Sequence, residues 1–223
     1  MPEENRRELL RLSREFDFPI LEDECYADLL WNSKRPIALA AMDNGNRVIH
    51  CGSFSKTIAP ALRVGYLVAD WHLLSQILAV KNDSGTGALE QMMLAEYCVN
   101  HFDDHVNKLS STLKDKLETL VEAVKVYFGT SAEFEVPEGG IFLWVSLPEH
   151  VDTIRLSQLA AKEGIAINPG PEWSTDTKPA SSKLRLCFGH PSKKIIEEGV
   201  SKLAEICHQE FGVPLRGANR IRS

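Results

Sequence analysis

Two serines, a lysine and an arginine share one short segment of the chain: Ser53, Ser55, Lys56 and Arg63. An arginine presents a rigid fork of N–H donors and serine hydroxyls add short ones, so this set suits an anionic group such as a phosphate. A lysine enclosed beside such groups can lose its proton and become a nucleophile toward a carbonyl carbon. The segment therefore predicts a Schiff-base lysine next to a phosphate-binding cluster.

Two predicted strands flank this segment. Arg47 to Cys51 (RVIHC) is short, apolar and β-branched enough for a buried strand, and Tyr66 to Ala69 (YLVA) is read as a second one. In α/β proteins the links that follow strands are where ligand chemistry is usually placed. We therefore expect Lys56 to lie in a loop just beyond the end of a strand.

The segment also carries a family resemblance. Ser53-x-Ser55-Lys56, with Arg63 seven residues on and Gly65-Tyr66 after it, resembles the cofactor-lysine segment of fold-type I pyridoxal-phosphate aminotransferases. The likeness is to the class I/II group, which includes aminoadipate-type aminotransferases and the aminotransferase-like domains of some transcription regulators. It implies that Lys56 binds pyridoxal 5'-phosphate covalently, and that the two serines and the arginine bind the cofactor phosphate. A surface turn with an ordinary lysine is the alternative for the segment alone.

A second candidate pair follows the short predicted strand Phe18 to Leu21, where the chain reads Glu22-Asp23-Glu24-Cys25-Tyr26. A carboxylate at such a strand end could keep a pyridinium nitrogen protonated, which makes the ring an electron sink. The resemblance gives that role to Asp23, and it implies that the Tyr26 phenol donates to the ring oxygen. The alternative is a solvated acidic loop. Glu22 and Glu24 are expected to be structural.

Arg185 lies within a predicted apolar strand, Leu184 to Phe188 (LRLCF). A charge is costly there unless it is paired. Leu184 and Leu186 should share one face of the strand, so Arg185 points the other way with Cys187. A guanidinium matches a carboxylate with two parallel hydrogen bonds, and the resemblance implies that Arg185 holds the α-carboxylate of the substrate. An exposed edge-strand arginine or a structural ion pair is the alternative.

Hydrophobic periodicity predicts the elements that position these residues. The predicted helices are Met1–Phe16, Asp70–Val80, Ala88–Asn100, Phe102–Phe128, Asp152–Lys162 and Lys193–Phe211. Beyond residue 131 the sequence predicts a hairpin of Phe134–Val136 and Ile141–Leu147, and another strand at Ile165–Asn168. Residues 27–46 are expected to be irregular, with a turn at 43–46.

These elements predict an α/β protein of the fold-type I pyridoxal-phosphate transferase class. Residues 1–104 are expected to be the remainder of a cofactor-binding large domain with a partial sheet, and residues 105–223 a smaller α+β C-terminal domain. In the resembled family, the preceding half of the large domain supplies a glycine-rich turn, a stacking aromatic and an asparagine, none of which has a candidate before Asp23. We therefore expect this chain to correspond to the C-terminal part of an aminotransferase and to bind the cofactor weakly by itself.

Composition narrows the function classes further. A net charge of −6 and a pI near 5.7 provide no electrostatic footprint for nucleic acid. No apolar run approaches a membrane span. The five scattered cysteines have no metal-ligand spacing, so we expect no metal and reduced thiols in the cytoplasm.

The resemblance implies transfer of an amino group from an amino acid to a 2-oxo acid, by a complete form that is usually a homodimer. Two alternatives stay open: a cofactor-binding sensor domain of a transcription regulator, and an inactive remnant of an aminotransferase.

Overall fold

The computed structural model describes residues 1–31, 34–44 and 46–215. The chain divides into two compact units, Met1–Leu109 and Ser110–Ser223, and each is described here by itself. The predicted boundary at 104/105 lies near this division, but the assignment of the units as parts of a large and a small domain stays a prediction. Within the described ranges, no helix combines the length and apolar character needed to cross a membrane.

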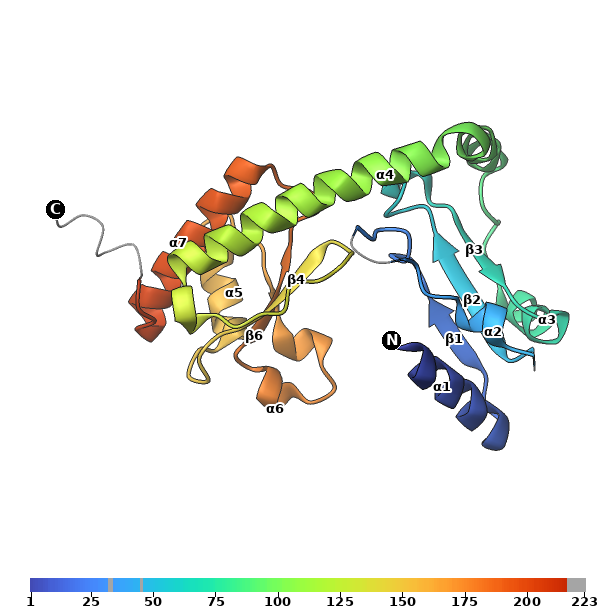
Figure 1. Cartoon of the computed structure of the whole chain (residues 1–223), viewed down its shortest axis with the longest axis horizontal. Coiled ribbons are helices and arrows are strands. Elements are labelled where there is room, and N and C mark those ends of the chain that lie inside the picture. The colour runs from blue at the N-terminus through green and yellow to red at the C-terminus, as the bar shows by residue number, and fades with distance from the viewer. Residues whose placement is uncertain (32–33, 45, 216–223) are drawn as a thin grey trace. The chain divides into compact units, whose positions relative to one another are not determined.

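A three-stranded sheet forms the centre of the first unit (Figure 1). Strand β1 (Ile20–Asp23) pairs in parallel with β2 (Val48–Ser53), and β3 (Gly65–Val68) runs antiparallel along the other edge of β2. Helix α1 (Glu3–Glu15) packs its apolar side against this sheet. The buried residues of that contact are Leu10, Ile20, Leu39 and Val48.

Sequence patterns located these strands to within a few residues but overstated how deeply they are buried. Both β1 and β2 are buried on alternate residues, and every residue of β3 is exposed. The stretch expected to be irregular contains a short helix, α2 (Leu39–Met42). The turn predicted at 43–46 includes Gly45, which lies outside the described residues. A single 3-10 turn, η1 (Pro60–Leu62), precedes β3.

Helix α3 (Trp71–Val80) is capped by Asp70, whose side chain accepts a hydrogen bond from the backbone N–H of His72. Helix α4 (Ala88–Tyr127) is continuous over 40 residues, so the prediction of two helices meeting near residue 101 is wrong. The stretch around residue 101 is rich in polar residues, among them Asn100, His101, Asp103 and Asp104. It includes no glycine or proline that would interrupt the backbone hydrogen bonds.

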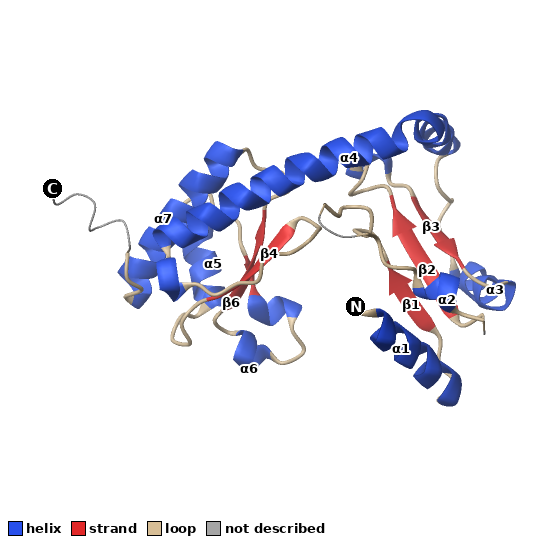
Figure 2. Cartoon of the chain, in the orientation of Figure 1, coloured by secondary structure: helices blue, strands red, loops and turns tan. Residues whose placement is uncertain are grey.

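The second unit is built on an antiparallel sheet with the strand order β4-β6-β5, flanked by helices (Figure 2). The strands are β4 (Phe142–Ser146), β5 (Asn168–Pro169) and β6 (Lys183–Cys187). The helices are α5 (Thr153–Lys162), α6 (Thr177–Ala180) and α7 (Lys193–Phe211), with 3-10 turns η2 (Gly129–Ser131) and η3 (Gly170–Trp173). Its fully buried side chains include Leu117, Val124, Leu143, Leu156, Leu184, Phe188 and Leu203.

The predicted hairpin of this unit is wrong in its first strand. Phe134–Val136 forms no strand, and only an isolated bridge joins Glu133 to Ser146 at the end of β4. Pro137 comes directly after Val136, and it has no backbone N–H to donate to a neighbouring strand. The strand predicted at Ile165–Asn168 is also shorter than expected, since β5 begins only at Asn168.

Candidate functional site

Two of the predicted site segments meet at one edge of the first sheet. Strands β1 and β2 are parallel, with Asp23 paired to Cys51 in the register, so their carboxyl ends lie side by side. Asp23 is the last residue of β1, and Ser53 is the last residue of β2. This edge is where open α/β sheets place their ligands.

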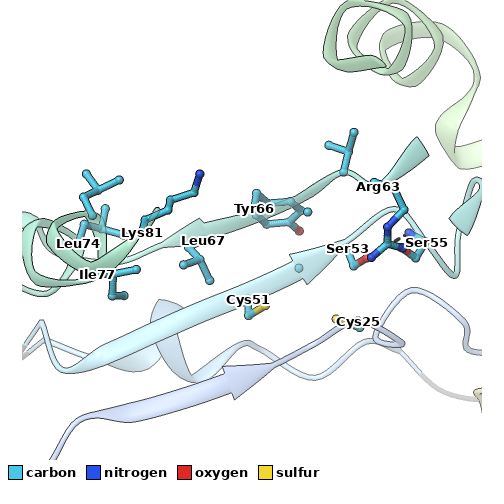
Figure 3. Close-up of a pocket in the computed structure, with 14 residues that line it drawn as sticks. Cys25, Cys51, Ser53, Ser55, Arg63, Tyr66, Leu67, Leu74, Ile77 and Lys81 are labelled. Carbon is cyan, nitrogen blue, oxygen red and sulfur yellow. Dashed lines mark hydrogen bonds between the residues drawn. The ribbon is translucent and has the colours of Figure 1, made fainter. Parts of the chain in front are cut away.

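A cavity of about 590 Å³ opens beside the end of β2 (Figure 3). Ser53, Ser55 and Arg63 lie together at one end of it, and apolar residues of α3 with Lys81 line the other end. The three residues predicted to bind a phosphate are thus neighbours in space. Two hydroxyls and a guanidinium form a donor set suited to an anion.

Local backbone geometry holds this polar cluster in place. The Ser53 hydroxyl oxygen accepts a hydrogen bond of 3.1 Å from the backbone N–H of Ser55, which tightens the turn after β2. Arg63 adopts a left-handed conformation (φ 53°) where η1 ends, and its Nη1 donates to the Pro60 carbonyl at 3.1 Å. This conformation is uncommon for an arginine, and it redirects the chain into β3.

Lys56 projects from the same turn and is exposed. Its Nζ lies 5.8 Å from the centroid of the Tyr26 ring, within the range of a cation–π contact. The structure therefore brings the predicted lysine and tyrosine together, although 30 positions separate them in the sequence.

Asp23 is exposed at the end of β1, and Cys25 holds its carboxylate. The backbone N–H of Cys25 donates to Asp23 Oδ1 at 3.0 Å. The Cys25 thiol, and after it this backbone N–H, lower the pKa of Asp23 below its usual value. The sequence-based prediction did not include Cys25 in the site. Its position two residues after Asp23 was the feature that could have pointed to this contact.

Tyr66 lies over Gly52, and both residues line the cavity. A β-carbon at position 52 would approach Tyr66 Cε1 to 2.6 Å, so only glycine leaves room for this ring. The ring centroid of Tyr66 also lies 5.9 Å from that of Phe54. Burial raises the pKa of the Tyr66 phenol, with the nearby charge of Asp28 acting in the same direction.

Glu22 belongs to a buried hydrogen-bonded network in the first unit. Its carboxylate accepts backbone N–H bonds from Leu39 at 2.7 Å and Ala40 at 3.1 Å, and it pairs with Arg6 and His50. Ligand atoms of Glu22, Glu24 and His50 all lie within 4.8 Å of one another, which is close enough to consider a metal. Because these hydrogen bonds already use the Glu22 oxygens, we assign no metal there.

Arg185, from the second unit, lies on β6 between aromatic side chains. Leu184 and Leu186 are buried, and Arg185 is half-buried on the opposite face of the strand, as predicted. Its Cζ lies 3.8 Å from the centroid of the Phe142 ring and 3.2 Å from that of the Trp173 ring. The sequence did not reveal these two aromatic contacts, because they join segments that are distant along the chain.

Comparison with known proteins gives this geometry a family. Residues 1–203 match the family model described as aminotransferase class I and II. The chain belongs to this family. The resemblance seen in the Lys56 segment is thereby confirmed for nearly the whole chain.

Relatives of this aminotransferase family member include both enzymes and regulators. The aromatic-amino-acid aminotransferase 1 of Thermococcus litoralis is 30% identical over 214 residues, which are 95% of this chain and 51% of that protein. The HTH-type transcriptional regulator NorG of Staphylococcus aureus is 34% identical over 204 residues, which are 90% of this chain and 45% of that protein. The chain spans about half the length of the curated relatives it matches.

Solved structures confirm the predicted α/β fold-type I class. The α-aminoadipate aminotransferase LysN of Thermus thermophilus, complexed with N-(5'-phosphopyridoxyl)-L-leucine, superposes with a TM-score of 0.87 at 26% identity. The match covers 96% of this chain and 56% of LysN. The family member described here therefore has the architecture of part of such an enzyme.

Proposed function

We propose that the protein containing this chain is a pyridoxal-phosphate-dependent aminotransferase, which transfers an amino group from an amino acid to a 2-oxo acid. The observation that carries the proposal is the cavity at the carboxyl end of β2, where Ser53, Ser55 and Arg63 gather beside the turn that bears Lys56. A phosphate-binding donor set next to an exposed lysine amine is what this chemistry requires.

The residues present fit the cofactor. The serine hydroxyls and the Arg63 guanidinium would hold its phosphate, and Lys56 Nζ would bind its aldehyde covalently. Asp23, which stays ionised because of its Cys25 donors, would bind the protonated ring nitrogen. Tyr26, beside Lys56, would donate its phenol to the ring oxygen. When bound, the cofactor supplies an electron sink that stabilises negative charge at the α-carbon of the substrate.

Lys56 would also carry the proton in the reaction. Its amine, when free, would act as a base that takes the α-proton of the substrate and returns it as an acid. Arg185 would orient the substrate by two parallel hydrogen bonds to its α-carboxylate. The remaining roles follow the family: we propose a homodimer in the cytoplasm that acts in amino acid metabolism and does not bind nucleic acid through this chain.

Borohydride trapping tests the proposal directly. The full-length protein, incubated with pyridoxal 5'-phosphate and reduced, should carry a phosphopyridoxyl group on the peptide that contains Lys56. Lys56→Ala should lose both this adduct and turnover with a panel of amino acids and 2-oxoglutarate. An adduct on Lys34 or Lys81 instead would remove the assignment.

Similarity to NorG favours a second candidate, a sensor domain that binds the cofactor without turnover. Such a protein would show the visible absorbance of the lysine-bound cofactor but release no 2-oxo acid from any amino acid in the panel. An inactive remnant would show neither signal. Absorbance and product release, measured on one preparation, therefore separate the three possibilities.

A further inference from the structure

Arg185 is stacked between two aromatic rings, Phe142 at 3.8 Å and Trp173 at 3.2 Å from its Cζ. Two rings cannot share one face of a guanidinium at these distances, because each is as wide as the group it covers. They therefore cover its opposite faces. A guanidinium held in this way can offer hydrogen bonds to a ligand only in its own plane.

The sheet supplies the first ring. In the antiparallel pair, Phe142 faces Cys187 and Trp144 faces Arg185 in the register. Directly opposed residues share a face, so Phe142 and Arg185 project from the same side of the sheet as diagonal neighbours. The Phe142 ring therefore reaches the guanidinium without any distortion of the strands.

A glycine allows the second ring to approach. Trp173 ends η3, and this turn begins at Gly170. A β-carbon at position 170 would lie 2.6 Å from the Lys183 carbonyl oxygen and would also clash with that of Ala180. Only glycine lets η3 pack this closely against the start of β6, and the close packing places Trp173 over Arg185.

We propose that Phe142, Arg185 and Trp173 form a flat anion slot that selects planar carboxylates over tetrahedral anions, with Trp173 as its specificity-determining residue. The proposal rests on the proposed role of Arg185 in substrate binding, and it adds the ligand chemistry that the site accepts. A carboxylate places both oxygens in the guanidinium plane and pairs with its edge. A tetrahedral anion directs an oxygen out of this plane, toward the negative faces of the flanking rings.

Small paired ligands test the slot without depending on a side-chain pocket. Propionate and ethanesulfonate carry the same charge and alkyl group, but their anionic centres are planar and tetrahedral. Affinities would be measured by ligand-observed NMR titration of the full-length protein saturated with pyridoxal 5'-phosphate, which keeps the phosphate site occupied. The same titrations of Arg185→Met measure the binding of each anion outside the slot. Subtracting that binding from the wild-type signal leaves the binding that depends on Arg185. We expect the wild-type slot to bind propionate about tenfold more tightly than ethanesulfonate, since impairing one charge-assisted hydrogen bond costs about 1.5 kcal/mol, which is roughly that factor.

Variants at position 173 decide whether the ring is responsible. Trp173→Leu should weaken propionate binding roughly 2- to 10-fold and reduce the preference over ethanesulfonate, because the guanidinium is then no longer held in one orientation before the ligand binds. Trp173→Phe retains a ring, so it should keep most of the affinity for propionate and most of the preference over ethanesulfonate. Trp173 is 51% exposed, so neither change should prevent folding. In turnover, Trp173→Leu should raise KM for the amino acid much more than it lowers kcat.

The possible outcomes separate this proposal from the function on which it rests. Equal wild-type affinities for the two anions, or unchanged selectivity in Trp173→Leu, would overturn the slot while leaving Arg185 as a carboxylate ligand. Unchanged propionate binding in Arg185→Met would instead overturn the role of Arg185, and the slot with it.

Discussion

Cys25 donates its backbone N–H to the Asp23 carboxylate at 3.0 Å, and its thiol donates to the same group. The two donors hold an exposed carboxylate at the end of β1 in one orientation. Because both lower the pKa of Asp23, the group carries its negative charge throughout the neutral range. A fixed, ionised carboxylate is what a protonated ring nitrogen needs as a partner.

Removing this charge should damage catalysis rather than folding. Asp23→Asn keeps the size of the side chain but removes the charge that, in the proposed role of Asp23, holds the ring nitrogen protonated. We expect turnover of the cofactor-saturated enzyme to fall on the order of a thousandfold, about 4 kcal/mol of barrier, with little change in thermal stability. Single-turnover absorbance measurements would check the chemical step. Near-normal rates would mean that another group supports the ring nitrogen.

The same pair predicts an unreactive thiol. Hydrogen bonding to Asp23, followed by burial, raises the pKa of Cys25 to about 12. Since the thiolate is the nucleophile, alkylation of Cys25 by iodoacetamide at pH 8 should be slower than that of the exposed Cys187 by on the order of a hundredfold. Peptide mass spectrometry over a time course would give both rates.

Asp23→Asn offers the internal control for this thiol. Without the carboxylate charge, Cys25 should ionise more readily, and its alkylation should accelerate while that of Cys187 stays constant. Rapid alkylation of Cys25 in the wild-type protein would show that the thiol–carboxylate contact does not exist in solution.

Acid should weaken the first unit through Glu22. Burial alone would raise the pKa of Glu22, but the backbone N–H groups of Leu39 and Ala40, together with His50, outweigh it and lower the value. A group with a lowered folded-state pKa stabilises the fold above its unfolded pKa, which is about 4.3, and this stability is lost as pH falls through the folded value.

Glu22→Gln tests this linkage. Breaking a buried ionic network by removing one partner costs about 3 kcal/mol, so the variant should be less stable by about that amount at pH 7. The difference should stay constant from pH 7 to 5 and shrink as the pH falls below the unfolded pKa and through the lowered folded-state pKa of Glu22, where the wild-type carboxylate becomes protonated as well. Denaturant unfolding in steps from pH 7 down to the acid limit of the folded protein would measure the two stabilities. A difference that does not shrink anywhere in this acid range would indicate a packing effect instead.

Local sequence patterns were sufficient for much of this fold. Apolar runs and helix spacing depend on neighbouring residues, so β1, β2, α5 and α7 could be predicted to within a few positions. The cluster of Ser53, Ser55 and Arg63 could be anticipated because one turn and one short link hold all three residues.

Long-range packing explains what was missed. Trp173 reaches Arg185 only because Gly170 lets a turn approach another strand, and no periodicity encodes that contact. Similarly, Phe134–Val136 has the composition of a strand, yet only the bridge at Glu133 pairs with Ser146. In both cases the partner segment, rather than the segment itself, decides the structure.

The contact of Gly52 with Tyr66 gives the last prediction. A β-carbon at position 52 would lie 2.6 Å from Tyr66 Cε1, so Gly52→Ala must displace the ring from the cavity wall. We expect a loss of about 1–3 kcal/mol in unfolding free energy, together with weaker cofactor binding, because the ring lines the cavity. The double variant Gly52→Ala/Tyr66→Leu removes the clash, so the alanine should then cost less than about 1 kcal/mol.

Gly199→Ala is the matched control for this test. Gly199 lies within α7, and a β-carbon there would meet nothing within 4 Å. The same substitution should therefore stabilise the protein by up to about 1 kcal/mol, because alanine favours a helix interior over glycine. Denaturant unfolding of Gly52→Ala, Tyr66→Leu, the double variant, Gly199→Ala and the wild type would complete the comparison. If Gly52→Ala costs as much with leucine at position 66 as with tyrosine, the strain lies in the backbone of β2 and not in the ring.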